Sequence, residues 1–203
     1  MSKLDFLNKW KDVDTYNESF TLFIDDITSS FSYCIQEYQV KNILEIGFYY
    51  GASAAFMLDF SPDIVVTSVD PGIHQCTLDS YPILKDRYPD RFTFILDDSK
   101  NILNHIRGQT FDLAFIDGDH NPLPVLRDIK SCLSLKIPYI LIDDIHDEIN
   151  ENNYNPQRNI KNTNFANHNG VSIAVNQIEK KGLIKPLKFW DIPVVGSKMG
   201  LFK

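Results

Sequence analysis

Acidic side chains gather at two places where an apolar run of the sequence ends. The segment Asp117-Gly118-Asp119-His120 follows the run 111–116, and Asp143-Asp144 follows the run 137–142. If these runs are neighbouring strands of one sheet, their ends lie ~5 Å apart and bring Asp117, Asp143 and Asp144 together. Carboxylates this close raise one another's pKa unless a cation joins them. Oxygen ligands of this kind suit Mg²⁺, Mn²⁺ or Ca²⁺.

A glycine-containing turn lies earlier in the chain, with the order Glu45-x-Gly47-x-x-x-Gly51. It follows an apolar run that starts at Ile43 and precedes an alanine-rich stretch of good helix formers. Glycine at the end of a strand lets a ligand approach the backbone, and the start of a helix offers free N–H groups. This segment therefore predicts the first strand, turn and helix of a nucleotide-binding α/β fold.

Two further strand ends carry polar residues. The run 64–69 ends at Asp70, and the run 92–96 is followed by Asp97-Asp98-Ser99. Ligands of open α/β sheets bind beyond the carboxyl ends of the strands. Asp70 lies where an acidic residue holds the ribose hydroxyls in such folds.

The elements that must position these residues alternate along the chain. Five apolar runs are separated by helical stretches, for example 124–133, and this alternation predicts a mostly parallel sheet. A helix around 171–178 and two closing strands at 188–190 and 199–202 complete it. We predict a single domain over residues 1–203, with N-terminal helices within residues 1–40.

Residues 147–169 differ from the rest of the chain. They contain nine asparagines and little apolar periodicity. A loop of this length inside a compact domain is usually functional or disordered. Because it directly follows Asp143-Asp144, we expect a lid over the acceptor site, and a disordered surface insertion stays open as the alternative.

Composition narrows the class of protein. The net charge of −7 disfavours a nucleic-acid-binding surface, and no apolar run approaches the ~20 residues of a membrane span. The three cysteines are widely spaced and fit neither a disulfide framework nor a zinc site, which suggests a reducing compartment. We therefore expect a cytoplasmic protein without a nucleic-acid or membrane partner, and a homo-oligomer stays open.

The glycine turn resembles motif I of the class I S-adenosylmethionine (SAM)-dependent methyltransferases, and Asp98-Ser99 resembles that family's segment beside the adenine. The resemblance implies a Rossmann-like, mostly parallel sheet of seven strands, the last antiparallel, with helices on both faces. It also implies SAM as cofactor, and the residues expected to bind it are Glu45, Gly47, Gly51, Ser53, Asp70, Asp98, Ser99 and Asp117.

The segments around Asp117 and Asp143 resemble the metal-dependent O-methyltransferase branch of that family, which includes catechol and macrolide-sugar O-methyltransferases. By this resemblance Asp117, Asp143 and Asp144 hold a divalent cation, with Mg²⁺ expected, and His120 is the general base. The implied acceptor is a small hydroxylated molecule, sugar-like or polyhydroxylated. His146 is a weaker candidate as base or ligand.

Two alternatives stay open. Asp117-Gly118-Asp119 is also a D-x-D pattern, as in metal-dependent nucleotide-sugar glycosyltransferases, although that reading gives Glu45 and the glycines no role. The other alternative is a SAM-binding scaffold without catalysis.

Overall fold

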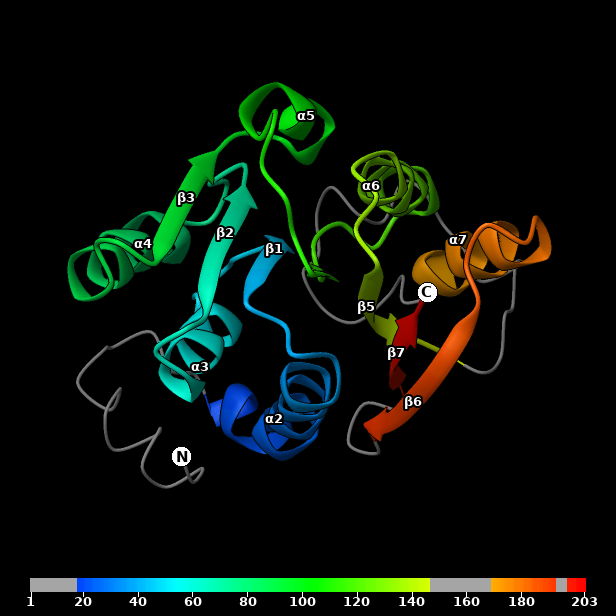
Figure 1. Ribbon diagram of the computed structural model, residues 1–203, viewed down its shortest axis with the longest axis horizontal. Coiled ribbons are helices and arrows are strands. Elements are labelled where there is room, and N and C mark those ends of the chain that lie inside the picture. Colours follow the sequence, from blue (N-terminus) through cyan, green and yellow to red (C-terminus); the bar gives the residue numbers. More distant parts are fainter. Residues whose placement is uncertain (1–17, 147–168, 193–196) are drawn as a thin grey trace.

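The computed structural model describes residues 18–146, 169–192 and 197–203 (Figure 1). The first 17 residues and most of the predicted lid, residues 147–168, lie outside the described residues. The predictions made for those segments therefore stay predictions.

Seven strands form one sheet in the order β3-β2-β1-β4-β5-β7-β6 (Figure 1). Strands β1 to β5 pair in parallel, whereas β7 is antiparallel to both β5 and β6. The predicted α/β fold with seven strands and an antiparallel last strand is confirmed. The strands are β1 Asn42–Ile46, β2 Val65–Asp70, β3 Phe92–Leu96, β4 Leu113–Ile116, β5 Tyr139–Ile145, β6 Pro186–Ile192 and β7 Ser197–Phe202.

Helices cover both faces of the sheet (Figure 1). On one face lie α2 (Glu18–Tyr38), α3 (Ala52–Phe60) and α4 (Gln75–Arg87). On the other lie α5 (Ile102–His105), α6 (Pro122–Ser134) and α7 (Asn169–Lys180), and the short 3₁₀ helix η1 (Ser99–Asn101) precedes α5. Within the described ranges, no helix combines the length and apolar character needed to cross a membrane.

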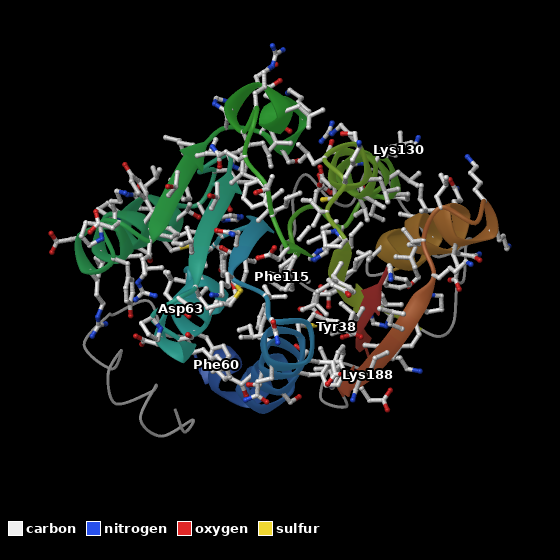
Figure 2. The ribbon with its side chains drawn as sticks, viewed as in Figure 1. Tyr38, Phe60, Asp63, Phe115, Lys130 and Lys188 are labelled. Atoms are coloured by element: carbon white, nitrogen blue, oxygen red, sulfur yellow. The ribbon has the colours of Figure 1, made fainter. Side chains whose placement is uncertain are left out.

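The central strands are buried on both faces because helices pack against each. Ile43 of β1 belongs to the core beneath α2 and α3, and its neighbour Leu44 belongs to the opposite core. Phe31 of α2 meets Phe115 of β4 edge to face, with ring centroids 4.9 Å apart, and Figure 2 shows Phe115 in the interior. This two-sided burial explains why the sequence shows continuous apolar runs in place of alternation.

The predicted end of the fifth strand, at Ile142, is wrong: β5 continues to Ile145. The antiparallel partner β7 causes the extension, since its pairing with β5 resumes at Ile145 opposite Lys198 after an irregularity that follows Ile142. Asp143 and Asp144 therefore lie within this irregular part of β5. Asp144 has a left-handed backbone with φ of 58°, which is uncommon outside glycine.

Candidate active site at the carboxyl edge of the sheet

The predicted site residues meet where the parallel strands end. The backbone N–H of Gly47 donates to the carbonyl of Val69 at 2.9 Å, and the N–H of Asp117 donates to the carbonyl of Ile46 at 2.9 Å. These bonds tie together the ends of β1, β2 and β4. The loops that carry the predicted chemistry thus start from one connected edge.

Gly47 has a different role from the one expected of it. Its φ is 96°, and an added Cβ would lie 2.1 Å from the carbonyl oxygen of Asp117. The space at this glycine is filled by the backbone that follows β4, so the expectation that it opens the turn to a ligand needs correction. Gly47 allows the loop carrying Asp117 to pack directly against the end of β1.

No side chain caps the start of α3. Its N-cap residue is Gly51, which has no side chain to bond the first N–H groups of the helix. An added Cβ on Gly51 would lie 2.2 Å from the ring of Phe48, so a larger residue cannot replace it without displacing that buried ring. Unpaired N–H groups at a helix start suit a carboxylate or phosphate group.

Glu45 supports this turn from the interior. Its side chain has 0% exposure, and its carboxylate accepts hydrogen bonds from the hydroxyls of Ser53 on α3 and Ser68 on β2. Burial raises the pKa of Glu45 to about 7, although both hydroxyls act in the opposite direction. The structure brings the predicted cofactor residues Glu45 and Ser53 together as a buried link between β1, β2 and α3.

Asp70 is held by the turns beside it. Its Oδ2 accepts the backbone N–H groups of Phe48 at 3.0 Å and Tyr49 at 3.2 Å, and its Oδ1 accepts that of Gly72 at 2.7 Å. A carboxylate offers about four acceptor positions. The described backbone groups fill three of them, so this side chain has room for one ribose hydroxyl more readily than for the predicted pair.

The turn after β3 is attached to α6. Ser99 donates its hydroxyl to Asp128 Oδ1 at 2.7 Å, and Arg127 Nη2 lies 3.4 Å from Asp98 Oδ1. Asp98 also accepts the N–H of Lys100 at 2.9 Å and thereby caps η1. Sequence reasoning selected Asp98 and Ser99 but missed their partners on α6. A signal for Asp128 was present, because this acid interrupts the buried stripe Val125, Ile129 and Cys132.

A cluster of potential ligand and base groups lies at the ends of β4 and β5. His120 Nε2 is 2.9 Å from Asp144 Oδ2. Among the described residues, Asp117, His120 and Asp144 each offer a ligand atom within 4.8 Å of the others. The predicted third ligand, Asp143, is not in this group, and its Oδ1 accepts the N–H of Asp144 at 2.8 Å.

The charges in this cluster are strongly coupled. The side chain of Asp117 reaches solvent, yet the surrounding protein atoms and then the charges of Asp143 and Asp144 raise its pKa well above the usual range. Burial lowers the pKa of His120, but the nearby negative charge of Asp144 outweighs burial and raises it. The cluster therefore favours a bound positive charge, either a proton on the imidazole or a cation.

The first turn of α7 packs against the same loops. An added Cβ on Gly170 would lie 2.1 Å from the carbonyl oxygen of His120, and the backbone N–H of His146 donates to Ser172 Oγ at 2.7 Å. Sequence reasoning missed both contacts, which join residues far apart in the chain. The start of α7 thus fixes the loops that follow β4 and β5.

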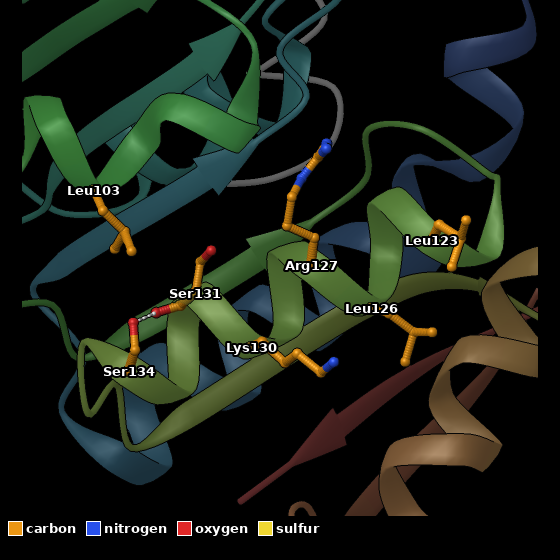
Figure 3. Close-up of a pocket in the computed structure, with 7 residues that line it drawn as sticks. All are labelled: Leu103, Leu123, Leu126, Arg127, Lys130, Ser131 and Ser134. Carbon is orange, nitrogen blue, oxygen red and sulfur yellow. Dashed lines mark hydrogen bonds between the residues drawn. The ribbon is translucent and has the colours of Figure 1, made fainter.

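The cavity in Figure 3 is separate from this site. It has a volume of about 390 Å³ and is a shallow depression beside α6, with one wall contributed by Leu103 of α5. Leu123, on its rim, is 77% exposed. None of the residues predicted for cofactor, metal or base lines it, so we place the candidate site at the strand ends.

Comparison with known proteins identifies the family of this chain and proteins that share its fold. A family model described as a methyltransferase domain matches residues 44–145, and a search of curated proteins gave no match. A Staphylococcus aureus structure assigned as a caffeoyl-CoA O-methyltransferase has a TM-score of 0.63 at 17% identity, covering 100% of this chain and 92% of that one. A Bacillus cereus O-methyltransferase in complex with S-adenosylhomocysteine (SAH) has a TM-score of 0.61 at 17% identity, covering 96% and 94%.

The structural neighbours also include an N-methyltransferase, NodS from Bradyrhizobium japonicum. Its TM-score is 0.61 at 13% identity, with 89% of this chain and 95% of that chain covered. Likeness at these identities establishes the shared fold and leaves the acceptor atom to be argued from the site. The comparisons do not favour the glycosyltransferase alternative.

Proposed function

The chain belongs to the methyltransferase-domain family matched over residues 44–145, and from this membership we propose that it is a SAM-dependent O-methyltransferase. The acceptor would be a hydroxyl group of a small molecule. The observation that carries the choice of oxygen is the close pair of His120 and Asp144, with Nε2 and Oδ2 2.9 Å apart, beside the acidic end of β4. A hydroxyl must lose its proton to become a good nucleophile, and this pair provides a base for it.

The cofactor side of the proposal rests on β1, α3 and β2. When bound, SAM supplies a methyl group on a positively charged sulfur. The N-terminus of α3 at Gly51, which no side chain caps, suits the carboxylate of its methionine part, and Asp70 suits one ribose hydroxyl. Both features lie at the same edge of the sheet as the base.

His120 is the residue that we propose to take the proton. The Asp144 carboxylate lies 2.9 Å from His120 Nε2, and this negative charge stabilises the imidazolium form. The neighbouring negative charges of Asp143 and Asp119 support the same protonated form. Together these groups would orient the acceptor hydroxyl and hold its proton at the imidazole.

The carboxylates of this site also fit a divalent cation, and we propose in addition that the reaction depends on one. Asp117 and Asp144 would hold it, with Asp143 as the predicted third carboxylate, and carboxylate oxygens suit Mg²⁺ or Mn²⁺. Such a cation supplies a Lewis acid that lowers the pKa of a bound hydroxyl. It would also relieve the repulsion that raises the pKa of Asp117.

A sugar-like or polyhydroxylated acceptor is supported by the resemblance of the segments around Asp117 and Asp143 to enzymes that methylate macrolide sugars. The structural neighbours include a protein named for caffeoyl-CoA, so aromatic hydroxyls belong in the same screen. A panel of sugars, catechols and phenolic esters, incubated with methyl-labelled SAM, would identify the acceptor by transfer of label.

Isothermal titration calorimetry with SAH tests the cofactor before any acceptor is known. We expect SAH to bind and UDP-glucose not to bind. Asp70→Asn should weaken SAH binding, whereas Asp90→Asn, at an exposed position after α4, should leave it unchanged. Binding of UDP-glucose without SAH would instead support the glycosyltransferase alternative.

A further inference from the structure

Two consecutive residues of α6 contact two consecutive residues of the turn after β3. Arg127 Nη2 lies 3.4 Å from Asp98 Oδ1, and Asp128 Oδ1 accepts the Ser99 hydroxyl at 2.7 Å. Both contacts join side chains 29 positions apart in the sequence. The turn is therefore attached to the helix at two adjacent points, which fixes its direction as well as its position.

Asp128 is an unusual residue for the place that it occupies. It is 1% exposed and lies among Val125, Ile129 and Cys132 on the buried face of α6. A carboxylate in such surroundings loses hydration, and an apolar side chain of similar size is often at least as stabilising. The hydroxyl of Ser99 and the Arg127 Nε, 3.9 Å away, compensate this loss in part. Stability alone is thus a poor reason for an aspartate here.

The turn that Asp128 contacts has little structure of its own. η1 has three residues and α5 has four, both too short to be stable without tertiary contacts. Asp97 bonds Asn101 and His105 within the segment, and its backbone N–H donates to the carbonyl of Asp70 at the end of β2 at 3.1 Å. This backbone bond holds only the start of the turn, and the contacts with α6 hold Asp98 and Ser99.

We infer that Asp128 is a positioning residue, which with Arg127 sets the Asp98–Ser99 turn against the adenosine part of the cofactor. The inference rests on the proposed function, because it takes SAM as the ligand. Asp128 is not placed in contact with the cofactor and acts through Ser99. Since α6 begins directly after the His120 loop, with Asn121 as its N-cap, the same helix connects the adenosine side of the site to the base.

Calorimetry with SAH on the full chain tests this inference. Asp128→Leu removes the acceptor of the Ser99 hydroxyl but fills the buried space. We expect it to weaken SAH binding about tenfold, which corresponds to about 1.4 kcal/mol, while the melting temperature stays the same or rises. Asp128→Asn keeps an acceptor oxygen and should rescue most of the affinity. A purely structural role would lower the melting temperature and leave the affinity of the folded protein unchanged.

Two further measurements localise the effect. 5′-Methylthioadenosine lacks the amino-acid half of SAH. The Asp128→Leu variant should bind it more weakly than the wild type does, by the same factor as for SAH. Ser99→Ala should weaken SAH binding similarly. The double variant with Asp128→Leu should bind SAH no more weakly than either single variant, because both substitutions break the same contact. Lys130→Leu, at an exposed position of the same helix, serves as the control.

The outcomes separate this inference from the proposed function. Wild-type affinity in folded Asp128→Leu would overturn the positioning role and leave the proposed function standing. If Asp128→Leu does not fold, SAH binding by Ser99→Ala is the deciding measurement. Unchanged SAH affinity in Ser99→Ala overturns the inference as well. A wild-type protein that binds neither SAH nor 5′-methylthioadenosine would overturn both.

Discussion

The 2.9 Å contact between His120 Nε2 and Asp144 Oδ2 is the basis for the proposed general base. We predict that His120→Asn lowers turnover of the identified acceptor by about 10²–10⁴-fold, the usual contribution of a general base. SAH affinity should not change, because the proposed cofactor contacts lie on β1, β2, α3 and the turn after β3, away from this imidazole. Label transfer from SAM under single-turnover conditions measures the first quantity, and calorimetry measures the second.

His146 provides the discriminating control for that prediction. It directly follows β5, whereas His120 follows β4, and its backbone N–H donates to Ser172 Oγ. His146→Asn should retain most of the turnover. Loss of turnover in His146→Asn with full activity in His120→Asn would show that the base has been assigned to the wrong residue.

A second prediction at the residue scale concerns binding of a divalent cation. Mn²⁺ or Mg²⁺ should raise the melting temperature of the wild-type protein, because a ligand that binds only the folded state stabilises it. Asp117→Asn and Asp144→Asn should abolish the increase, whereas Asp63→Asn, on the exposed surface, should not. Asp143→Asn decides between the ligand set predicted from the sequence and the observed group of Asp117, His120 and Asp144. Full turnover in excess chelator would remove the cation from the mechanism.

Some features of the site could be predicted from the sequence and others could not, for a physical reason. Asp70, Asp117 and Ser99 follow apolar runs, so their place at the strand ends could be predicted from local pattern. Their hydrogen-bond partners depend on which distant segments pack beside them. Asp128 on α6 and the backbone N–H of Phe48 come within reach only through the tertiary fold.

At the scale of elements, strand prediction succeeded where local burial determines the strand. β3 has the predicted bounds Phe92–Leu96, and its ends are set by its own sequence. The carboxyl end of β5 was predicted three residues too early, at Ile142, since the antiparallel partner β7 extends the strand past the irregularity at Asp143 and Asp144. A pairing between segments more than 50 residues apart leaves no local signal at Ile142.

The turn between β1 and α3 gives a prediction at this scale. Gly47→Ala should destabilise the protein by more than ~2 kcal/mol, because the new Cβ would overlap the Asp117 carbonyl and alanine disfavours positive φ. Gly108→Ala is the matched control: its φ is 79°, but no atom lies within 4 Å of the added Cβ. That change should cost only the ~1–2 kcal/mol of the backbone conformation. Urea unfolding of both variants measures the difference, and equal losses would contradict the packing role of Gly47.

For the molecule as a whole, the sheet order determines where the site lies. The strand order reverses between β1 and β4, and ligands of open α/β sheets bind beside such a switch point. Gly47 and Asp117 are the first residues after these two strands, and their backbones are in contact. The cofactor turn and the acidic cluster therefore share one edge, while helices cover both faces and exclude water from the two cores.

The same burial gives the whole molecule a characteristic pH dependence. Burial raises the pKa of Glu45 from 4.5 to about 7 and that of Asp128 from 3.8 to about 6. An acid whose pKa is higher in the folded state binds more protons there than in the unfolded state. Its stabilising effect is therefore complete below its unfolded pKa and is lost as the pH rises through its folded pKa. Asp97, whose pKa is lowered to about 2 mainly by its hydrogen bond with Asn101, acts only at more acidic pH.

We therefore predict that the chelator-treated protein becomes less stable between pH 5 and pH 7.5. At about 1.4 kcal/mol per pKa unit, the combined loss in the free energy of unfolding is a few kcal/mol. Urea titrations at the two pH values measure it. Glu45→Gln and Asp128→Asn remove the titrating groups but keep an acceptor oxygen for the serine hydroxyls, so each should flatten the dependence. Stability that does not fall over this range would mean that the two acids ionise in the folded protein at least as readily as in water, which would contradict a pKa raised by burial.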